Sequence, residues 1–181
     1  MDKIKKVSRF VRYYLWAYII WNVGGHFLAH AHQFTFTLSW MDTFPDYKLP
    51  GITMDFFALP FWQRFLVSVV SFPSLLFQML AAYSLLCLMK LYENAEYFTE
   101  RTSRLFRNIG VFVLWSEALN IIMQVPTSYC LTFMNPPGQR MINVSLSNHN
   151  IEGIALATVI LLVGWIMERA AKLQEDSNAT I

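Results

Sequence analysis

The segment FLVSVVSFPSLLFQMLAAYSLLCLM, residues 65–89, contains no charged side chain. An α-helix crosses the apolar core of a bilayer with about 20 predominantly apolar residues, so this segment is long enough to span a membrane. Three further stretches are similarly apolar, at residues 13–32, 108–125 and 153–167, and the last reaches spanning length when it is extended back toward Asn148. We therefore predict an all-α integral membrane protein, built as a bundle of four transmembrane helices.

The composition of the whole chain agrees with this fold class. Of its 181 residues, 55% are hydrophobic and 14% are charged, whereas soluble domains carry about 25% charged residues. The longest stretch between the expected helices, residues 33–60, is too short for a separate catalytic domain. The sequence has no hydrolase triad, glycine-rich phosphate loop or Cys-x-x-Cys pair. We therefore expect a non-enzymatic protein that does not bind nucleic acid.

The pattern of apolar and helix-breaking residues divides a single membrane domain, residues 1–181, into its elements. Pro73 is expected to kink the second helix, and Thr99 is expected to cap the third. The first apolar stretch follows a basic start, as in a signal peptide, but its long and bulky middle predicts a retained helix. The expected helices are residues 8–32, 61–92, 100–126 and 148–170, with external loops at 33–60 and 127–147 and a cytoplasmic tail at 171–181.

Two parts of the external loops alternate between apolar and polar residues, which is the pattern of a β-strand. Residues 34–40 show it directly after the first helix. Residues 141–146 show it after a turn at 135–138, which predicts a hairpin with residues 129–133. We therefore expect a small β element over the external end of the bundle.

The distribution of basic residues predicts the orientation, because Lys and Arg are enriched on the cytoplasmic side of membrane proteins. If the amino terminus, the middle loop and the carboxyl tail share one side, that side carries 11 of the 14 basic residues. Both termini are therefore predicted to be cytoplasmic, and Cys87 and Cys130 then lie too far apart for a disulfide. The eleven residues are Lys3, Lys5, Lys6, Arg9, Arg12, Lys90, Arg101, Arg104, Arg107, Arg169 and Lys172.

Glu117 interrupts the third apolar stretch, about 14 Å from its start near Asn108. A carboxylate at that depth is expected to face other helices or a water-filled cavity, because lipid cannot solvate it. Asn120 and Gln124 lie on the same helix face, and Asn22 reaches a similar depth on the first helix. We expect these four residues to form an intramembrane polar cluster, with a hydrogen bond between Glu117 and Asn22. Such a cluster can hold helices together, move protons or ions, or contact a ligand or partner helix.

Histidines near the external ends of two helices are candidate metal ligands. His26 and His30 are four residues apart on one face of the first helix, and His149 and Glu152 begin the fourth. Two imidazoles at this spacing and a ligand from a facing helix can bind zinc or copper. Contacts with lipid headgroups or loop carbonyls are the alternative role. Haem is not expected, because no histidine lies deep in another helix.

Arg101, Arg104 and Arg107 occupy the first two turns of the expected third helix, where anionic lipid headgroups are expected to bind them. The phrases around them, LYENAEYFTE at 91–100 and RLFRNIG at 104–110, and the ending ERAAKLQEDSNATI at 168–181, resemble a bacterial four-helix membrane family called domain of unknown function twenty-nine seventy-five. The resemblance spans residues 65–181 and implies a bacterial cytoplasmic membrane. It also suggests a small helix-turn-helix regulator encoded nearby, but it supplies no catalytic residue.

The expected function is that of an accessory, sensory or immunity-type partner in the membrane, associated with lipid and with another membrane protein or with further copies of itself. The first alternative is a small transporter-like or proton-coupled protein that uses Glu117. The second is a metal-binding redox protein that uses the external histidines. The sequence leaves these three roles open.

Overall fold

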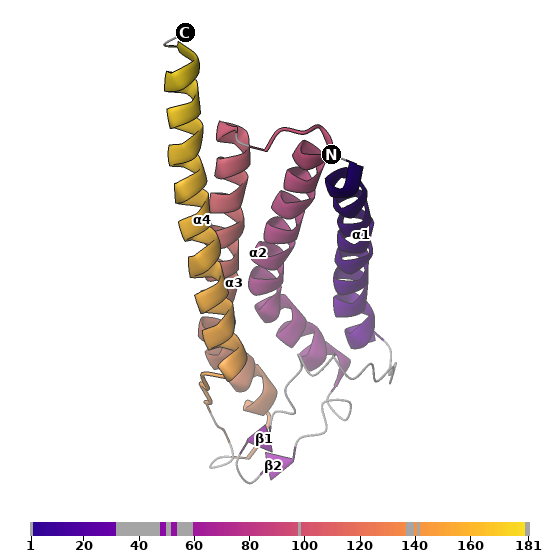
Figure 1. Ribbon diagram of the computed structural model, residues 1–181. Coiled ribbons are helices and arrows are strands. Elements are labelled where there is room, and N and C mark those ends of the chain that lie inside the picture. Colours follow the sequence, from indigo (N-terminus) through magenta and orange to yellow (C-terminus); the bar gives the residue numbers. More distant parts are fainter. Residues whose placement is uncertain are drawn as a thin grey trace.

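The computed structural model contains four long helices (Figure 1). It describes residues 2–31, 48–49, 52–53, 60–97, 99–136, 140 and 142–179, and the side chains of residues 4–25, 60–97, 99–136, 140 and 142–173. The helices are α1 (Asp2–Ala31), α2 (Phe61–Glu93), α3 (Glu100–Thr132) and α4 (Asn148–Ala179). The last three begin where the sequence pattern placed them, whereas α1 begins earlier and α3 and α4 end later than expected.

The helices run in alternating directions, so the start of α1, the turn between α2 and α3, and the end of α4 lie toward one end of the molecule (Figure 1). We call this the basic end, because the expected cytoplasmic Lys and Arg residues belong to it. Extensive contacts join α1 with α2, α2 with α3, and α3 with α4. Within the described residues, α1 and α4 make no comparable contact with each other. The helices therefore form an open series rather than a closed ring.

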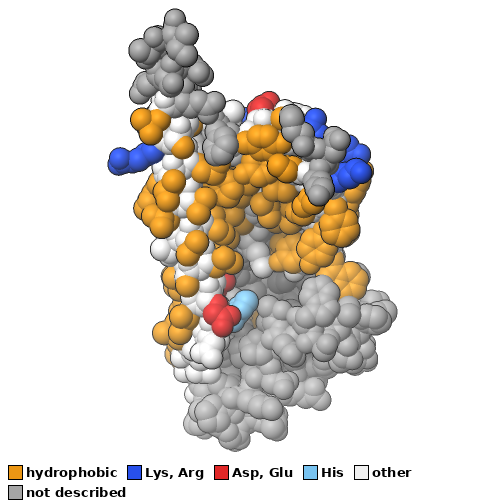
Figure 2. Space-filling view, in the orientation of Figure 1, with side chains coloured by type: hydrophobic (Ala, Val, Ile, Leu, Met, Phe, Trp, Pro, Cys, Tyr) orange, Lys and Arg blue, Asp and Glu red, His pale blue; other side chains and the backbone are white. Residues whose placement is uncertain are grey.

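Three helices are long and apolar enough to cross a membrane: α2, α3 and residues 148–173 of α4. Over its described side chains, residues 4–25, α1 is not among them, because this range includes the charged residues Lys5, Lys6, Arg9 and Arg12. The surface between the ends is apolar, as Figure 2 shows for one face, where the Lys and Arg side chains lie near the basic end. Large hydrophobic side chains such as Phe65, Trp115 and Val159 are exposed on this surface. A membrane is the environment that matches it.

α3 continues past Pro126 to Thr132, so the expected end of the third helix at residue 126 is wrong. Proline removes one backbone donor but does not stop a helix whose other groups are satisfied by neighbours. Gln63 of α2 supplies such a neighbour, because its Nε2 donates to the carbonyl oxygens of Cys130 at 2.8 Å and Leu131 at 3.0 Å. Gln63 is only 1% exposed, so these bonds fix the end of α3 against the start of α2.

The expected hairpin over residues 127–147 is also wrong within the described residues. Residues 127–132 belong to α3, and residues 142–147 are neither helix nor strand. A short antiparallel pair, β1 (Lys48–Leu49) and β2 (Ile52–Thr53), provides a β element in the first loop, with Lys48 opposite Thr53. The strand expected at residues 34–40 lies outside the described residues.

The turn between α2 and α3 is held by local hydrogen bonds. The backbone N–H of Glu96 donates to Leu91 and that of Ala95 donates to Tyr92, which is the Schellman pattern at a helix end. Ala95 has φ 64°, a left-handed conformation that glycine normally adopts. Thr99 then caps α3, because its side chain accepts a hydrogen bond from the N–H of Thr102. The cap expected at Thr99 is confirmed.

Candidate functional site

Glu117 of α3 lies against the first turns of α4. Its Oε2 accepts a hydrogen bond from Asn150 Nδ2 at 3.0 Å. Its Oε1 is only 2.6 Å from the point where a Cβ atom on Gly153 would lie. The missing side chain of Gly153 therefore makes room for the carboxylate. Because the start of a helix carries a partial positive charge, this position also favours a negative side chain.

Asn150 connects Glu117 to the cap of α4. Its Oδ1 accepts hydrogen bonds from the backbone N–H of Ser147 at 3.1 Å and from the Ser147 hydroxyl at 2.6 Å. In return, the Ser147 hydroxyl accepts the N–H of Asn150 at 3.3 Å. This is a capping box in which asparagine replaces the usual Glu or Gln. Asn150 is 3% exposed. Its buried side chain therefore has two roles, since it completes the cap of α4 and donates to Glu117.

The segment before α4 runs back along α3 and is held by two further polar residues. Gln124 Oε1 accepts the N–H of Ser145 at 2.7 Å, and the Ser128 hydroxyl donates to the Asn143 carbonyl at 3.1 Å. Together with Glu117 these contacts make a polar ladder, which we define as Glu117, Gln124 and Ser128 on α3 with their partners between residues 143 and 150. The ladder sets where α4 begins relative to α3.

The structure thus separates the four residues expected to form one polar cluster. Glu117 and Gln124 both belong to the polar ladder. Asn22 instead donates to the Tyr18 carbonyl of its own helix at 2.9 Å, so the expected bond between Glu117 and Asn22 is not formed. The reason is the open helix series, in which α1 packs on α2 and not extensively on α3. Asn120 is exposed on α3.

The structure describes the side chains of two of the four candidate metal ligands. His149 and Glu152 are exposed on the first turn of α4. The side chains of His26 and His30 lie outside the described residues. Across the described side chains, no group of three or more His, Cys, Asp and Glu residues is placed to hold a metal. Cys87 and Cys130 are free thiols.

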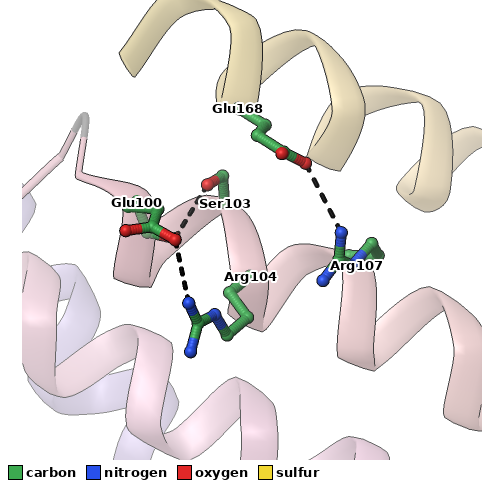
Figure 3. Close-up of a pocket in the computed structure, with 5 residues that line it drawn as sticks. All are labelled: Glu100, Ser103, Arg104, Arg107 and Glu168. Carbon is green, nitrogen blue, oxygen red and sulfur yellow. Dashed lines mark hydrogen bonds and ion pairs between the residues drawn. The ribbon is translucent and has the colours of Figure 1, made fainter. Parts of the chain in front are cut away.

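A second polar feature is a pocket between α3 and α4 at the basic end (Figure 3). Its volume is about 100 Å³, and Glu100, Ser103, Arg104, Arg107 and Glu168 line it. Arg104 contacts Glu100 of the same helix at 2.8 Å, and Arg107 reaches Glu168 of α4 at 3.5 Å. Glu168 also contacts Lys172 at 3.3 Å, so it is shared by two cations.

Close backbone packing places the two helices beside this pocket. A Cβ atom on Gly164 of α4 would lie 3.0 Å from the backbone nitrogen of Arg107.

Of the three arginines expected to contact headgroups, Arg104 and Arg107 line the pocket, while Arg101 is exposed outside it. All three lie on the first two turns of α3, next to the apolar stretch.

Three of the residues that organise these sites were not singled out from the sequence. Gln63, Ser147 and Asn150 make buried or capping contacts whose partners lie far away or in a loop. A serine followed three residues later by a polar side chain, at the start of an apolar run, is the pattern of a capping box. Ser147 and Asn150 have this spacing. Nothing in the sequence pattern indicates that Gln63 contacts the end of α3.

Comparison with known proteins gives a family and no relative of established function. No curated protein and no solved structure matches the chain. The family described as protein of unknown function (DUF2975) matches residues 11–181. The match includes α1 from residue 11 onward, so it extends well before residue 65, where the sequence resemblance begins. Because it covers nearly the whole chain, the protein belongs to this family.

Proposed function

We propose that the protein is a non-enzymatic, multi-pass protein of a bacterial cytoplasmic membrane that acts as an accessory, sensory or immunity-type partner of another membrane protein. One observation carries this proposal. Two amide side chains, Gln78 on α2 and Asn120 on α3, are exposed within the apolar helices. Lipid offers amides no hydrogen bonds, whereas a neighbouring transmembrane helix does.

The open helix series supports the same role. α1 and α4 each pack extensively against one neighbour, which leaves helix surface free at both ends of the series. Gln78 uses its Nε2 to donate to the Tyr18 hydroxyl at 3.0 Å, and its carbonyl oxygen remains an acceptor. A partner helix that carries a polar side chain at the depth of Gln78 or of Asn120 can satisfy that amide. Four helices alone enclose little space for a substrate path.

A photoreactive amino acid at position 120 tests the partner role in native membranes. We expect illumination to join the chain to a discrete protein, and an adduct of twice 21.1 kDa would identify that protein as a second copy. The matched control is the same substitution at Ala157, which is fully buried against the rest of the chain. If position 120 gives no more protein adduct than position 157, Asn120 faces lipid and the proposal is wrong.

The same proposal places both termini in the cytoplasm and makes α1 a fourth helix that crosses the membrane. The grouping of basic residues supports this orientation. The Arg12–Glu93 ion pair at 3.0 Å holds the start of α1 beside the end of α2, which supports α1 as a crossing helix antiparallel to α2. Fusions of a periplasm-active phosphatase to residue 181 and to residue 140 test it. Activity is expected from the fusion at residue 140 alone, and the reverse pattern would invert the orientation.

Proton coupling through Glu117 is the second candidate, favoured by a carboxylate inside an apolar helix with a polar ladder leading toward the end opposite the basic end. Glu117→Gln keeps the shape and the acceptor for Asn150 but cannot titrate. Proteoliposomes with an internal pH dye are expected to show proton entry for the wild type and not for this variant. Equal rates for wild type, variant and protein-free vesicles would exclude the role.

A further inference from the structure

We propose that the pocket between α3 and α4 at the basic end binds the phosphate group of an anionic phospholipid headgroup. This inference is independent of the partner role. Two arginines from successive turns of α3, Arg104 and Arg107, provide the donors (Figure 3). The planar guanidinium group matches phosphate oxygens with paired N–H donors. Each guanidinium has five N–H donors, and the described contacts engage one nitrogen of each.

The size of the pocket selects the ligand. Its volume of about 100 Å³ is far below the roughly 300–1,000 Å³ of sites that enclose drug-sized molecules. A nucleotide is therefore too large, whereas a single phosphate group is small enough. The rest of a phospholipid would remain outside the pocket, with its chains along the apolar surface of the helices.

The charge around the pocket favours an anion. Within four residues of its lining along the chain there are five cations and three carboxylates, which is a net charge of +2. The ion pairs do not cancel this excess, because Arg104 and Arg107 keep 62% and 45% of their side chains exposed. Exposed pairs of this kind are weak, because water screens them. The five cations are Arg101, Arg104, Arg107, Arg169 and Lys172, and the carboxylates are Glu96, Glu100 and Glu168.

The position in the fold separates a lipid from other sources of phosphate. The uncharged stretch of α3 begins directly after Arg107, and that of α4 ends directly before Glu168. The pocket thus lies where apolar helix surface meets the charged end, at the level of headgroups. Basic pockets between transmembrane helices on the cytoplasmic side bind anionic headgroups in this way. Gly164 holds the two helices together at its base.

The test is a titration of the full-length protein in neutral detergent with short-chain phosphatidylglycerol, with the apparent Kd read from the thermal unfolding midpoint. Each basic residue near the surface is worth about 1 kcal/mol toward anionic lipid, or about fivefold. Replacing both Arg104 and Arg107 with Gln is therefore expected to weaken binding about 30-fold. Replacing both Arg101 and Arg169 with Gln removes the same two charges from outside the pocket, and is expected to weaken binding about fivefold or less.

Glu168→Gln distinguishes a phosphate site from a purely structural ion-pair cluster. It removes the carboxylate that competes for Arg107 and Lys172. Phosphatidylglycerol is then expected to bind about fivefold more tightly. A structural cluster would lose stability without any gain in binding, which would overturn the proposal.

Two further ligands identify the source of the phosphate. Zwitterionic phosphatidylcholine is expected to give no saturable shift in the unfolding midpoint. If inorganic phosphate protects as well as phosphatidylglycerol at equal concentration, the site takes a free anion and the lipid assignment is wrong. If the double Gln variant does not fold, replacing both arginines with Lys keeps the charge and removes the paired donors. Wild-type affinity in that Lys variant would refute the role of the guanidinium groups.

Discussion

Asn150→Ala is the substitution with the most clearly calculable effect. The change removes the Oδ1 atom that accepts from the N–H and hydroxyl of Ser147 in the α4 capping box, and loss of such a capping interaction costs about 1 kcal/mol. It also removes the donor to Glu117. Hydrogen bonds between membrane helices are worth about 0.6 kcal/mol on average and up to about 1.7, and bonds to charged groups lie at the high end. The free energy of unfolding is therefore expected to fall by about 2–3 kcal/mol.

Unfolding of the detergent-solubilised protein by added sodium dodecyl sulfate, followed by circular dichroism, measures this loss. Asn148→Ala is the matched control, because Asn148 is exposed two residues away on the same turn. It is expected to change stability by less than about 0.5 kcal/mol. A double-mutant cycle with Glu117→Ala should give a coupling energy of about 1–2 kcal/mol. Equal losses for Asn150→Ala and Asn148→Ala, or a coupling energy near zero, would refute the bond between α3 and α4.

Three further substitutions are measured by the same unfolding assay. Ala95→Gly is expected to stabilise the protein by about 1 kcal/mol, because it relieves a left-handed residue at φ 64°, and a loss of stability would contradict the Schellman turn. Gly164→Ala is expected to destabilise by about 1–3 kcal/mol, since its Cβ would lie 3.0 Å from the backbone nitrogen of Arg107. Gly24→Ala, where nothing lies within 4 Å, is the control and should be neutral or stabilising. Gln63→Leu is expected to cost about 1–3 kcal/mol, and a loss below about 0.5 would mean that the α3 carbonyls have other donors.

The positions of the helices follow from the sequence because lipid imposes a simple rule on them. Uncharged runs of spanning length must be helical, and their starts are marked by residues such as Thr99 that satisfy free N–H groups. The starts of α2, α3 and α4 were predictable for that reason. The polar side chains inside the runs were also readable as costly, so Glu117 and Gln124 stood out before their partners were known.

The partners themselves depend on how the helices are arranged, which the pattern of one chain does not encode. Depth alone predicts a bond between Glu117 and Asn22, yet depth does not say which helices are neighbours. Pro126 predicts a helix end, but α3 continues because Gln63, more than 60 positions earlier in the chain, stabilises its last turn. The alternating residues 142–147 form no strand, because the backbone groups of Asn143 and Ser145 bond to side chains of α3 and not to a neighbouring strand.

The placement of α4 has a mechanical consequence. α4 is one unbroken helix from Asn148 to Ala179, and its close contact with α3 at Gly164 lies near its midpoint. The half of α4 before Gly164 is fixed to α3 by the Asn150–Glu117 bond and by the close approach of Gly110 and Leu161. The half after Gly164 is about 22 Å long and extends beyond the other helices (Figure 1). A bend of about 10° at Gly164 would therefore move the carboxyl tip by about 4 Å while the amino-terminal half stays in place.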